Sequence, residues 1–216
     1  MPTDWLAWHA PYDDPTSPLS RRLAAVTAGV TSWLDAARPG PLQAISCCAG
    51  QGRDLTDALR RHPRAPDVRA LLVEADERNG AVAAERAEAA GLSQVTVRVA
   101  DASATDVYAG AVPADLVLVC GVFGNISDDD IAHTVACLPS LCAPGATVVW
   151  TRHRRPPDRT PDIRRWLVAA GFEELSFTAP AEDVFAVGVA RLSGAPLPFE
   201  PGVRLFEFVG DGHRPA

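Results

Sequence analysis

The sequence predicts an α/β protein with a doubly wound, mostly parallel sheet of seven strands that ends in an antiparallel strand pair. Three observations support this. Short apolar runs alternate with segments of helical periodicity; the first run leads into a turn spaced by Gly50 and Gly52; and the second run ends on Glu74. Apolar strands that alternate with helices are typical of a parallel sheet covered on both faces. Ligands of such sheets lie at the carboxyl ends of the strands.

Composition narrows the class of protein. The chain has 216 residues, an apolar fraction of 47% and a formal net charge of −7. We therefore expect one globular domain with a substantial core and no nucleic-acid partner, because phosphate binding depends on Lys and Arg. No apolar stretch is long enough to span a membrane, and no signal peptide is evident. A homodimer is compatible with the sequence.

Cysteine usage points to a reducing compartment. The five cysteines are odd in number and contain no CxxC pair, so neither a disulfide framework nor a bound metal is expected. Several of them lie in or beside apolar runs, where reduced, buried thiols are common. We therefore expect a cytoplasmic protein.

The N-terminal residues 1–36 are expected to form a leader and lid helix that precedes a core of residues 37–216. The leader is rich in aromatic and turn-forming residues. Ser17 and Pro18 then have the pattern of a helix N-cap followed by proline in the first turn. Apolar residues at three- and four-residue steps give the following helix one apolar face, and a Pro-Gly-Pro sequence at 39–41 ends it.

Beyond this break, strands and helices alternate. The apolar runs predict parallel strands at residues 42–47, 68–74, 95–99, 116–120 and 147–151. The periodic segments between them predict helices at 54–61 and 77–90, a helix capped by Ser127, and a helix that opens at Thr160 and ends before Gly171. Residues 173–178 and 185–191 are expected to form the antiparallel pair, and the tail at 204–209 is a candidate for a further strand.

The candidate ligand site lies where the first four strands end. Glycines at 50 and 52 let backbone N–H groups approach a ligand closely. Glu74 follows at roughly the 20-residue spacing at which a carboxylate binds a ribose. Asp101 follows the third strand, and Cys120 ends the fourth. The alternatives are a surface carboxylate for Glu74 and a turn-forming role for Asp101.

With these motifs the chain resembles the class I S-adenosylmethionine-dependent methyltransferases, over about residues 17–191 and most specifically at 46–54, 73–76, 100–102 and 115–125. The resemblance implies S-adenosyl-L-methionine as cofactor. It places the methionine part at the glycine turn, the ribose at Glu74 and the adenine at Asp101. The implied cofactor-binding residues are Cys48, Ala49, Gly50, Gly52, Asp54, Glu74, Ala75, Asp101, Ala102, Cys120 and Gly121.

The sequence departs from the family pattern at two places. Ser46 and Cys48 stand where the family usually has an acidic residue and its first glycine. The family acid orients the ammonium group of the cofactor, and Asp54 is a candidate substitute. The Asp/Asn-Pro-Pro-Tyr/Phe signature of base- and glutamine-methylating relatives is missing after the fourth strand, which argues against a DNA, RNA or ribosomal target.

Three segments are candidates for acceptor binding. Trp8 and Tyr12 of the leader are placed to cover the sulfonium, although they can equally pack the leader onto the sheet. Phe123 and Asn125 follow the fourth strand, where Asn125 either orients a substrate or caps a turn. Arg152 opens an arginine-rich run that either holds an anionic substrate group or forms a solvated loop.

The expected reaction is methyl transfer to an oxygen or nitrogen of a small-molecule acceptor. His153 and His9 are the candidate general bases, because an unperturbed histidine titrates near neutral pH. One alternative is a protein that binds the cofactor without methylating. A nicotinamide-dependent oxidoreductase is a further alternative, but Leu55 stands where the usual dinucleotide motif has its third glycine.

Overall fold

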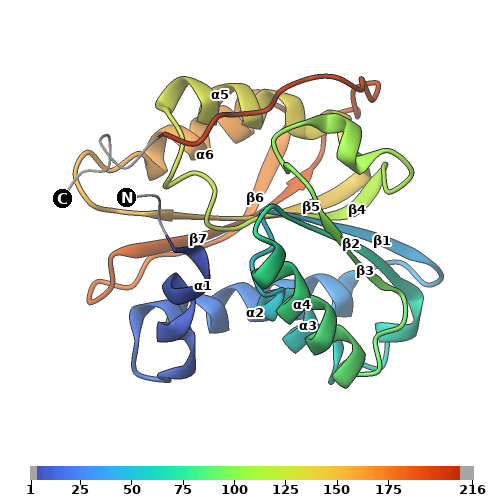
Figure 1. Ribbon diagram of the computed structural model, residues 1–216. Helices are drawn as coiled ribbons and strands as arrows, with labels where there is room; N and C mark the ends of the chain where they lie inside the picture. The colour runs from blue at the N-terminus through green and yellow to red at the C-terminus, as the bar shows by residue number, and fades with distance from the viewer. Residues whose placement is uncertain (1–3, 210–216) are drawn as a thin grey trace.

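The computed structural model describes residues 4–209 and contains one seven-stranded sheet with helices on both faces (Figure 1). The strand order is β3-β2-β1-β4-β5-β7-β6; the first five strands of that order are parallel, and β7 is antiparallel to both of its neighbours. The predicted fold class is confirmed. The strands are β1 (Leu42–Cys47), β2 (Val68–Glu74), β3 (Val95–Val99), β4 (Ala114–Val119), β5 (Cys142–His153), β6 (Phe172–Thr178) and β7 (Phe185–Leu192).

Side-chain caps fix where the main helices begin. The hydroxyl of Ser17 accepts the backbone N–H of Ser20, the carboxylate of Asp76 accepts two N–H groups of the next helix, and Ser127 accepts the N–H of Asp130. On one sheet face lie α2 (Pro18–Ala36), α3 (Arg53–Leu59) and α4 (Glu77–Ala89), and on the other lie α5 (Asp128–Cys137) and α6 (Thr160–Ala169) (Figure 1).

The observed bounds of β1, β2 and β3 agree closely with those predicted from the sequence, whereas β5 is longer than predicted. Pairing with β7 runs from Thr147 opposite Arg191 to His153 opposite Phe185. This antiparallel partner carries β5 beyond the apolar residues that signalled it, because backbone hydrogen bonds do not require apolar side chains. The strand therefore delivers Arg152 and His153 to the same sheet edge as the glycine turn.

Two apolar layers hold the helices against the sheet. Alternate residues of one strand face opposite layers: Val148 and Trp150 of β5 pack on the side of α5 and α6, whereas Val149 packs on the side of α2. Trp150 is almost fully buried between Phe123 and Phe177.

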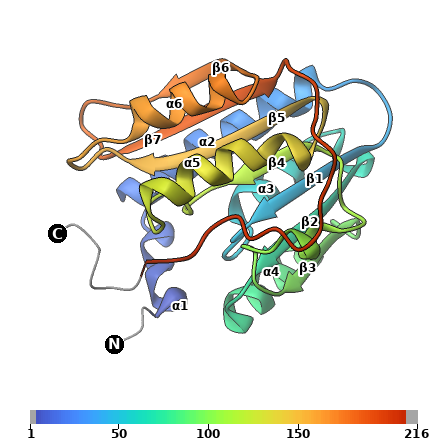
Figure 2. The same cartoon turned by 90° about the horizontal axis from the view of Figure 1, so that it is seen from above.

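The C-terminal tail does not add the strand that the sequence had suggested. It crosses the molecule as an irregular segment, and only two isolated bridges, Ala104 with Arg204 and Ile126 with Phe208, are of β type (Figure 2). The tail runs past the α5 face instead of along a sheet edge, so it cannot continue a ladder. Its last described residues lie beside the N-terminal helix, and the N–H of Val209 donates to the carbonyl of Asn125.

No helix in the described part of the chain is long and apolar enough to cross a bilayer.

A glycine in β7 leaves the space for the Trp150 ring, which predicts the effect of Gly188→Ala. A Cβ at position 188 would lie 2.3 Å from Trp150 Nε1. Overpacking of this kind costs about 1–3 kcal/mol, so chemical denaturation should show a loss of that size. Leu175→Ala, on the exposed side of β6, is the control and should stay within about 0.5 kcal/mol of the unchanged protein. Equal stabilities of the two variants would contradict this packing.

Candidate functional site

A pocket opens at the carboxyl ends of β1, β2 and β4, below the N-terminal segment. The space between its lining atoms is about 980 Å³, a value that includes the part open to solvent. Its lining combines aromatic, acidic, basic and thiol side chains with glycine backbone. The lining residues are Trp5, Trp8, His9, Tyr12, Arg22, Leu23, Cys48, Ala49, Gly50, Gln51, Arg53, Asp54, Glu74, Ala75, Asp76, Asn79, Cys120, Gly121, Asn125 and Phe208.

The turn after β1 has the left-handed backbone that its glycines permit. Cys48, Gly50 and Gly52 have φ values of 51°, 55° and 64°. At position 50 the lack of a side chain is also a steric requirement, because a Cβ there would lie 2.3 Å from Nε2 of His9. The backbone of the turn therefore lies directly against the N-terminal segment.

Glu74 holds the same turn from the end of β2. Its Oε2 accepts the N–H of Gly50 at 2.7 Å and its Oε1 accepts the N–H of Asp76 at 2.9 Å. The side chain is buried and its orientation is fixed by these two bonds. Because an ionised carboxylate accepts about four hydrogen bonds, Glu74 keeps acceptor capacity toward the pocket.

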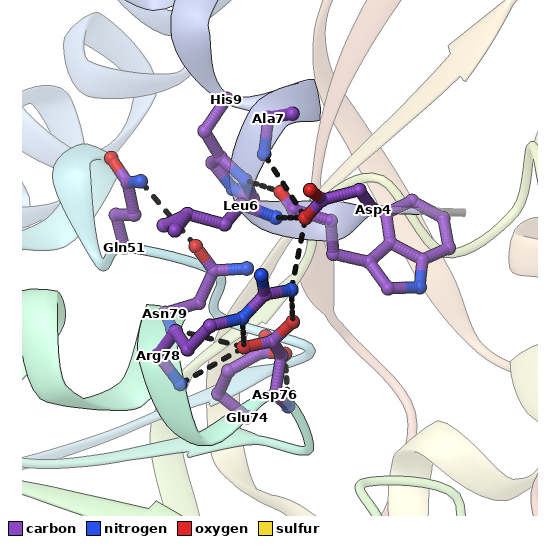
Figure 3. Close-up of polar contacts among 10 residues, drawn as sticks. Asp4, Leu6, Ala7, His9, Gln51, Glu74, Asp76, Arg78 and Asn79 are labelled. Atoms are coloured by element: carbon purple, nitrogen blue, oxygen red, sulfur yellow. Dashed lines mark hydrogen bonds and ion pairs between the residues drawn. The ribbon is translucent and has the colours of Figure 1, made fainter. Parts of the chain in front are cut away.

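Beside Glu74, a buried amide points into the pocket. Asn79 is fully buried, and its Oδ1 accepts a hydrogen bond from Gln51 Nε2 at 3.3 Å (Figure 3). Its Nδ2 has no partner among residues 4–209. A buried donor without a partner costs free energy, and a ligand acceptor in the pocket would satisfy it.

The N-terminal segment covers the pocket as a lid made of α1 (Trp5–Trp8) and the 3₁₀ turn η1 (Ala10–Asp13). Arg78 ties it to the start of α4, since its Nη2 lies 2.9 Å from Asp4 Oδ1 and 2.8 Å from Asp76 Oδ2 (Figure 3). Arg53 ties the other end through Asp13 at 2.8 Å. The lid is thus ion-paired to both helices that flank the glycine turn.

Opposite charges lie under the lid. Arg22 of α2 donates to the hydroxyl of Tyr12, and its guanidinium carbon lies 5.7 Å from the ring centre of Trp8. Asp54 lies in the first turn of α3, and its Oδ1 accepts only a local backbone N–H, that of Leu55. Burial raises the pKa of Asp54, and the charge of Arg22 opposes that shift.

The C-terminal tail completes the rim. Phe208 lines the pocket and lies 6.2 Å, centre to centre, from the ring of Trp5. Because Phe208 is bridged to Ile126 and packs on Phe206, the tail holds this aromatic contact in place. Both chain ends therefore contribute to one wall.

By sequence, the chain matches no protein-family model and no curated protein. Solved structures do match its fold. An O-methyltransferase family protein from Burkholderia thailandensis superposes with a TM-score of 0.63 and 15% identity, over 81% of this chain and 56% of that one. This chain thus spans little more than half the length of that protein.

Two other matches cover nearly all of their proteins and were solved with ligands. Magnesium protoporphyrin IX methyltransferase from Synechocystis PCC 6803, with bound S-adenosylmethionine, gives a TM-score of 0.63 and 16% identity over 88% of this chain and 91% of that one. The 1,6-didemethyltoxoflavin-N1-methyltransferase of Burkholderia thailandensis was solved with bound 1,6-didemethyltoxoflavin and S-adenosylhomocysteine. It gives a TM-score of 0.61 and 17% identity over 88% of this chain and 87% of that one. The chain has the class I methyltransferase fold.

Within this methyltransferase fold, the pocket brings together most of the predicted site residues. These are Trp8, His9, Tyr12, Cys48, Ala49, Gly50, Asp54, Glu74, Ala75, Cys120, Gly121 and Asn125. Their roles toward a cofactor or acceptor stay predictions. Their convergence follows from parallel strands, whose carboxyl ends share one sheet edge.

Six predicted residues do not line the pocket. Phe123 is fully buried, and its ring centre lies 6.2 Å from that of Trp150. The expectation that its side chain contacts a substrate is therefore corrected, because Phe123 belongs to the core. Ala102 is likewise in the core, and Gly52 faces Leu72 behind the turn. Asp101 lies just after β3, where it accepts the N–H of Ser103 and forms an ion pair with Arg204 of the tail. Arg152 and His153 are the other two.

His153 is not at the pocket but behind the loop that follows β4. Its Cδ2 lies 3.3 Å from the position of a Cβ on Gly124, and its Nδ1 is buried without a partner in the described residues. Burial, followed by the charges of Arg152 and Arg155, lowers the pKa of His153 to about 4. The ring is therefore neutral near pH 7, and between the two candidate bases only His9 lines the pocket.

The pocket residues that the sequence did not single out come mainly from helices and the tail. Asp76 and Asn79 could have been found as the N-cap and first turn of the helix after Glu74. No sequence pattern places Arg22 at the pocket, because its position depends on how α2 packs beneath the lid. Phe208 reaches the pocket only through the path of the tail.

No group of three or more metal-ligating His, Cys, Asp or Glu side chains occurs within residues 4–209.

The contact of His9 with the turn predicts the effect of Gly50→Ala. The methyl group would displace His9, so hydrogen–deuterium exchange of residues 4–13 should become faster. Gly91→Ala is the control, because Gly91 also has a left-handed backbone, with φ of 69°, but no atom within 4 Å of an added Cβ. Both variants should lose about 1–2 kcal/mol to backbone strain. Unchanged exchange of the lid in Gly50→Ala would contradict the contact.

Proposed function

We propose that the protein is an S-adenosylmethionine-dependent methyltransferase that methylates an oxygen or nitrogen of a small-molecule acceptor. The observation that carries the proposal is the joining of the left-handed glycine turn to Glu74 at the floor of a lidded pocket, through the Gly50–Glu74 hydrogen bond of 2.7 Å. The resemblance to the class I methyltransferases implies the cofactor at this position. The matched structures with bound S-adenosylmethionine or S-adenosylhomocysteine support this assignment.

The residues at the pocket suit an adenosyl amino acid. Gly50 and its neighbours Cys48 and Ala49 line the pocket, so the backbone of the turn is part of the wall that a ligand meets. Asn79 Nδ2 is a buried donor without a partner, and Glu74 keeps free acceptor positions. Together they offer a donor and an acceptor to the two hydroxyls of a ribose.

The charges under the lid suit the methionine end. An α-amino acid carries an ammonium and a carboxylate on one carbon, and Asp54 and Arg22 offer the matching opposite charges in one pocket. Asp54 thereby replaces the acidic residue that the first strand lacks, since Ser46 occupies that position and is buried. We assign Asp54 to the ammonium group and Arg22 to the carboxylate.

When bound, the cofactor supplies an already activated methyl group on a sulfonium. The protein then has to align the acceptor and exclude water, which contributes about 7–11 kcal/mol in well-oriented reactions. Trp8 and Tyr12 of the lid supply aromatic faces, which attract a cation. The ion pairs of Arg78 and Arg53 hold this lid against the turn.

His9 is the candidate general base. Its Nδ1 lies 2.6 Å from the carbonyl oxygen of Trp5 and must donate there, which leaves the lone pair on Nε2. Burial lowers the pKa of His9, so the ring is neutral near pH 7 and able to accept a proton from an acceptor hydroxyl or ammonium.

Two observations support a small-molecule acceptor. The net charge of −7 disfavours nucleic acid. In addition, matched structures with this fold include a porphyrin methyltransferase and a didemethyltoxoflavin methyltransferase.

The ribose assignment predicts a loss of affinity in Glu74→Ala. Removing hydrogen bonds to a charged group costs about 1.5–3 kcal/mol, so binding of labelled S-adenosylmethionine should weaken roughly 10- to 100-fold. The exposed neighbour Glu77→Ala is the charge-matched control and should bind as the unchanged protein does. Equilibrium dialysis measures both.

Three outcomes of the same assay would count against the proposal. Failure of the unchanged protein to bind S-adenosylmethionine would overturn it, and tighter binding of NAD or NADP would favour an oxidoreductase. Binding without conversion to S-adenosylhomocysteine across a broad panel of acceptors would favour a non-methylating role.

The methionine assignment predicts a ligand-dependent effect of Arg22→Ala and Asp54→Asn. Both should weaken binding of S-adenosylhomocysteine about 10- to 100-fold and leave 5′-methylthioadenosine, which lacks the amino acid, nearly unaffected. Arg60→Ala, a partly exposed arginine at the far end of α3, is the control and should change neither. Equal losses for the two ligands would show that these side chains act on the lid or fold instead.

A further inference from the structure

Arg152 is a half-buried cation that forms no ion pair or hydrogen bond with another described residue. It is the penultimate residue of β5, and its Nε is buried without a hydrogen-bond partner in the part of the chain that the structure describes. Burial lowers the pKa of Arg152; the charge of Asp128 opposes this shift and the charge of Arg159 adds to it. An unpaired buried charge is costly, so such a side chain suits a ligand that brings the missing anion.

The other arginines near Arg152 have structural partners or are exposed. The partnered ones hold loops and helix ends: Arg154 donates to the carbonyls of Pro180 and Asp183, Arg159 pairs with Asp128 and Asp162, Arg164 with Glu174, and Arg165 with Asp162. Arg155 is exposed to solvent. Arg152 alone in this group combines burial with a lack of partners.

The position of Arg152 connects it to the pocket. Its Nη1 lies 3.5 Å from where a Cβ of Gly124 would be. Gly124 belongs to the loop after β4, in which Gly121 and Asn125 line the pocket. Because residue 124 has no side chain, the guanidinium lies directly against the backbone of this loop.

We propose that Arg152 binds a carboxylate group of the methyl acceptor and thereby selects acidic small molecules. This inference rests on the proposed methyltransferase function. A guanidinium matches a planar carboxylate with two parallel hydrogen bonds. A dianionic phosphate fits less well, because the adjacent His153 ring is neutral near pH 7 and Asp128 and Asp158 lie near the guanidinium.

The test compares two probes that differ only in charge, 4-hydroxybenzoate and 4-hydroxybenzamide, with inorganic phosphate as a third. Affinities are measured by ligand-observed NMR, with the protein both saturated with S-adenosylhomocysteine and free of it. We expect the benzoate to bind at least tenfold more tightly than the benzamide and than phosphate. Arg152→Ala and Arg152→Gln should abolish this preference, Arg152→Lys should keep part of it, and the exposed control Arg155→Ala should keep all of it.

Each other result would overturn the inference. Equal affinities of the two aromatic probes, absence of binding, or a preference that survives in both Arg152→Ala and Arg152→Gln would remove Arg152 as the anion site. Tighter binding of phosphate would replace the carboxylate with a phosphorylated acceptor. Failure of S-adenosylhomocysteine itself to bind would count against the proposed function, and the measurements without it would still decide the role of Arg152.

Discussion

The hydrogen bond from the N–H of Gly50 to the carboxylate of Glu74 is the contact on which the site depends. It links the turn after β1 to the end of β2 within the buried floor of the pocket. It holds the turn in a left-handed conformation that only a glycine adopts without strain at this position. Since His9 packs where a Cβ would otherwise be, the same turn also sets how closely the lid approaches.

The lid and the tail show how a small sheet protein builds a closed site from its two chain ends. Ion pairs through Arg78 and Arg53 attach the lid to the helices beside the turn. The tail brings Phe208 against Trp5 from the opposite side of the sheet. No residue of α1 or η1 is buried, so the exposed ion pairs contribute to the attachment of the lid, and ionic strength weakens them more than it weakens the core.

Charge is distributed unevenly around the pocket. Most of the described arginines outside it are ion-paired or bonded to carbonyls. Arg22, in contrast, lies below the lid against aromatic rings, and Arg152 lies behind the loop after β4 with no ion pair among the described residues. Asp54 is half-buried in the same pocket as Arg22. Because charges inside a protein are costly, their concentration at one sheet edge supports the proposal that charged ligand groups bind there.

The sequence by itself determined the sheet, its parallel core, the glycine turn and the role of Glu74 as its neighbour, because periodicity and spacing are local properties of the chain. It could not determine that Phe123 is a core residue, that the tail crosses the sheet without forming a strand, or that Arg22 and Phe208 reach the pocket. Those features depend on which surfaces meet when distant segments pack. Arg152 is the clearest case: the sequence offered a run of arginines, and only the packing of β5 against the loop after β4 left one of them buried without a partner.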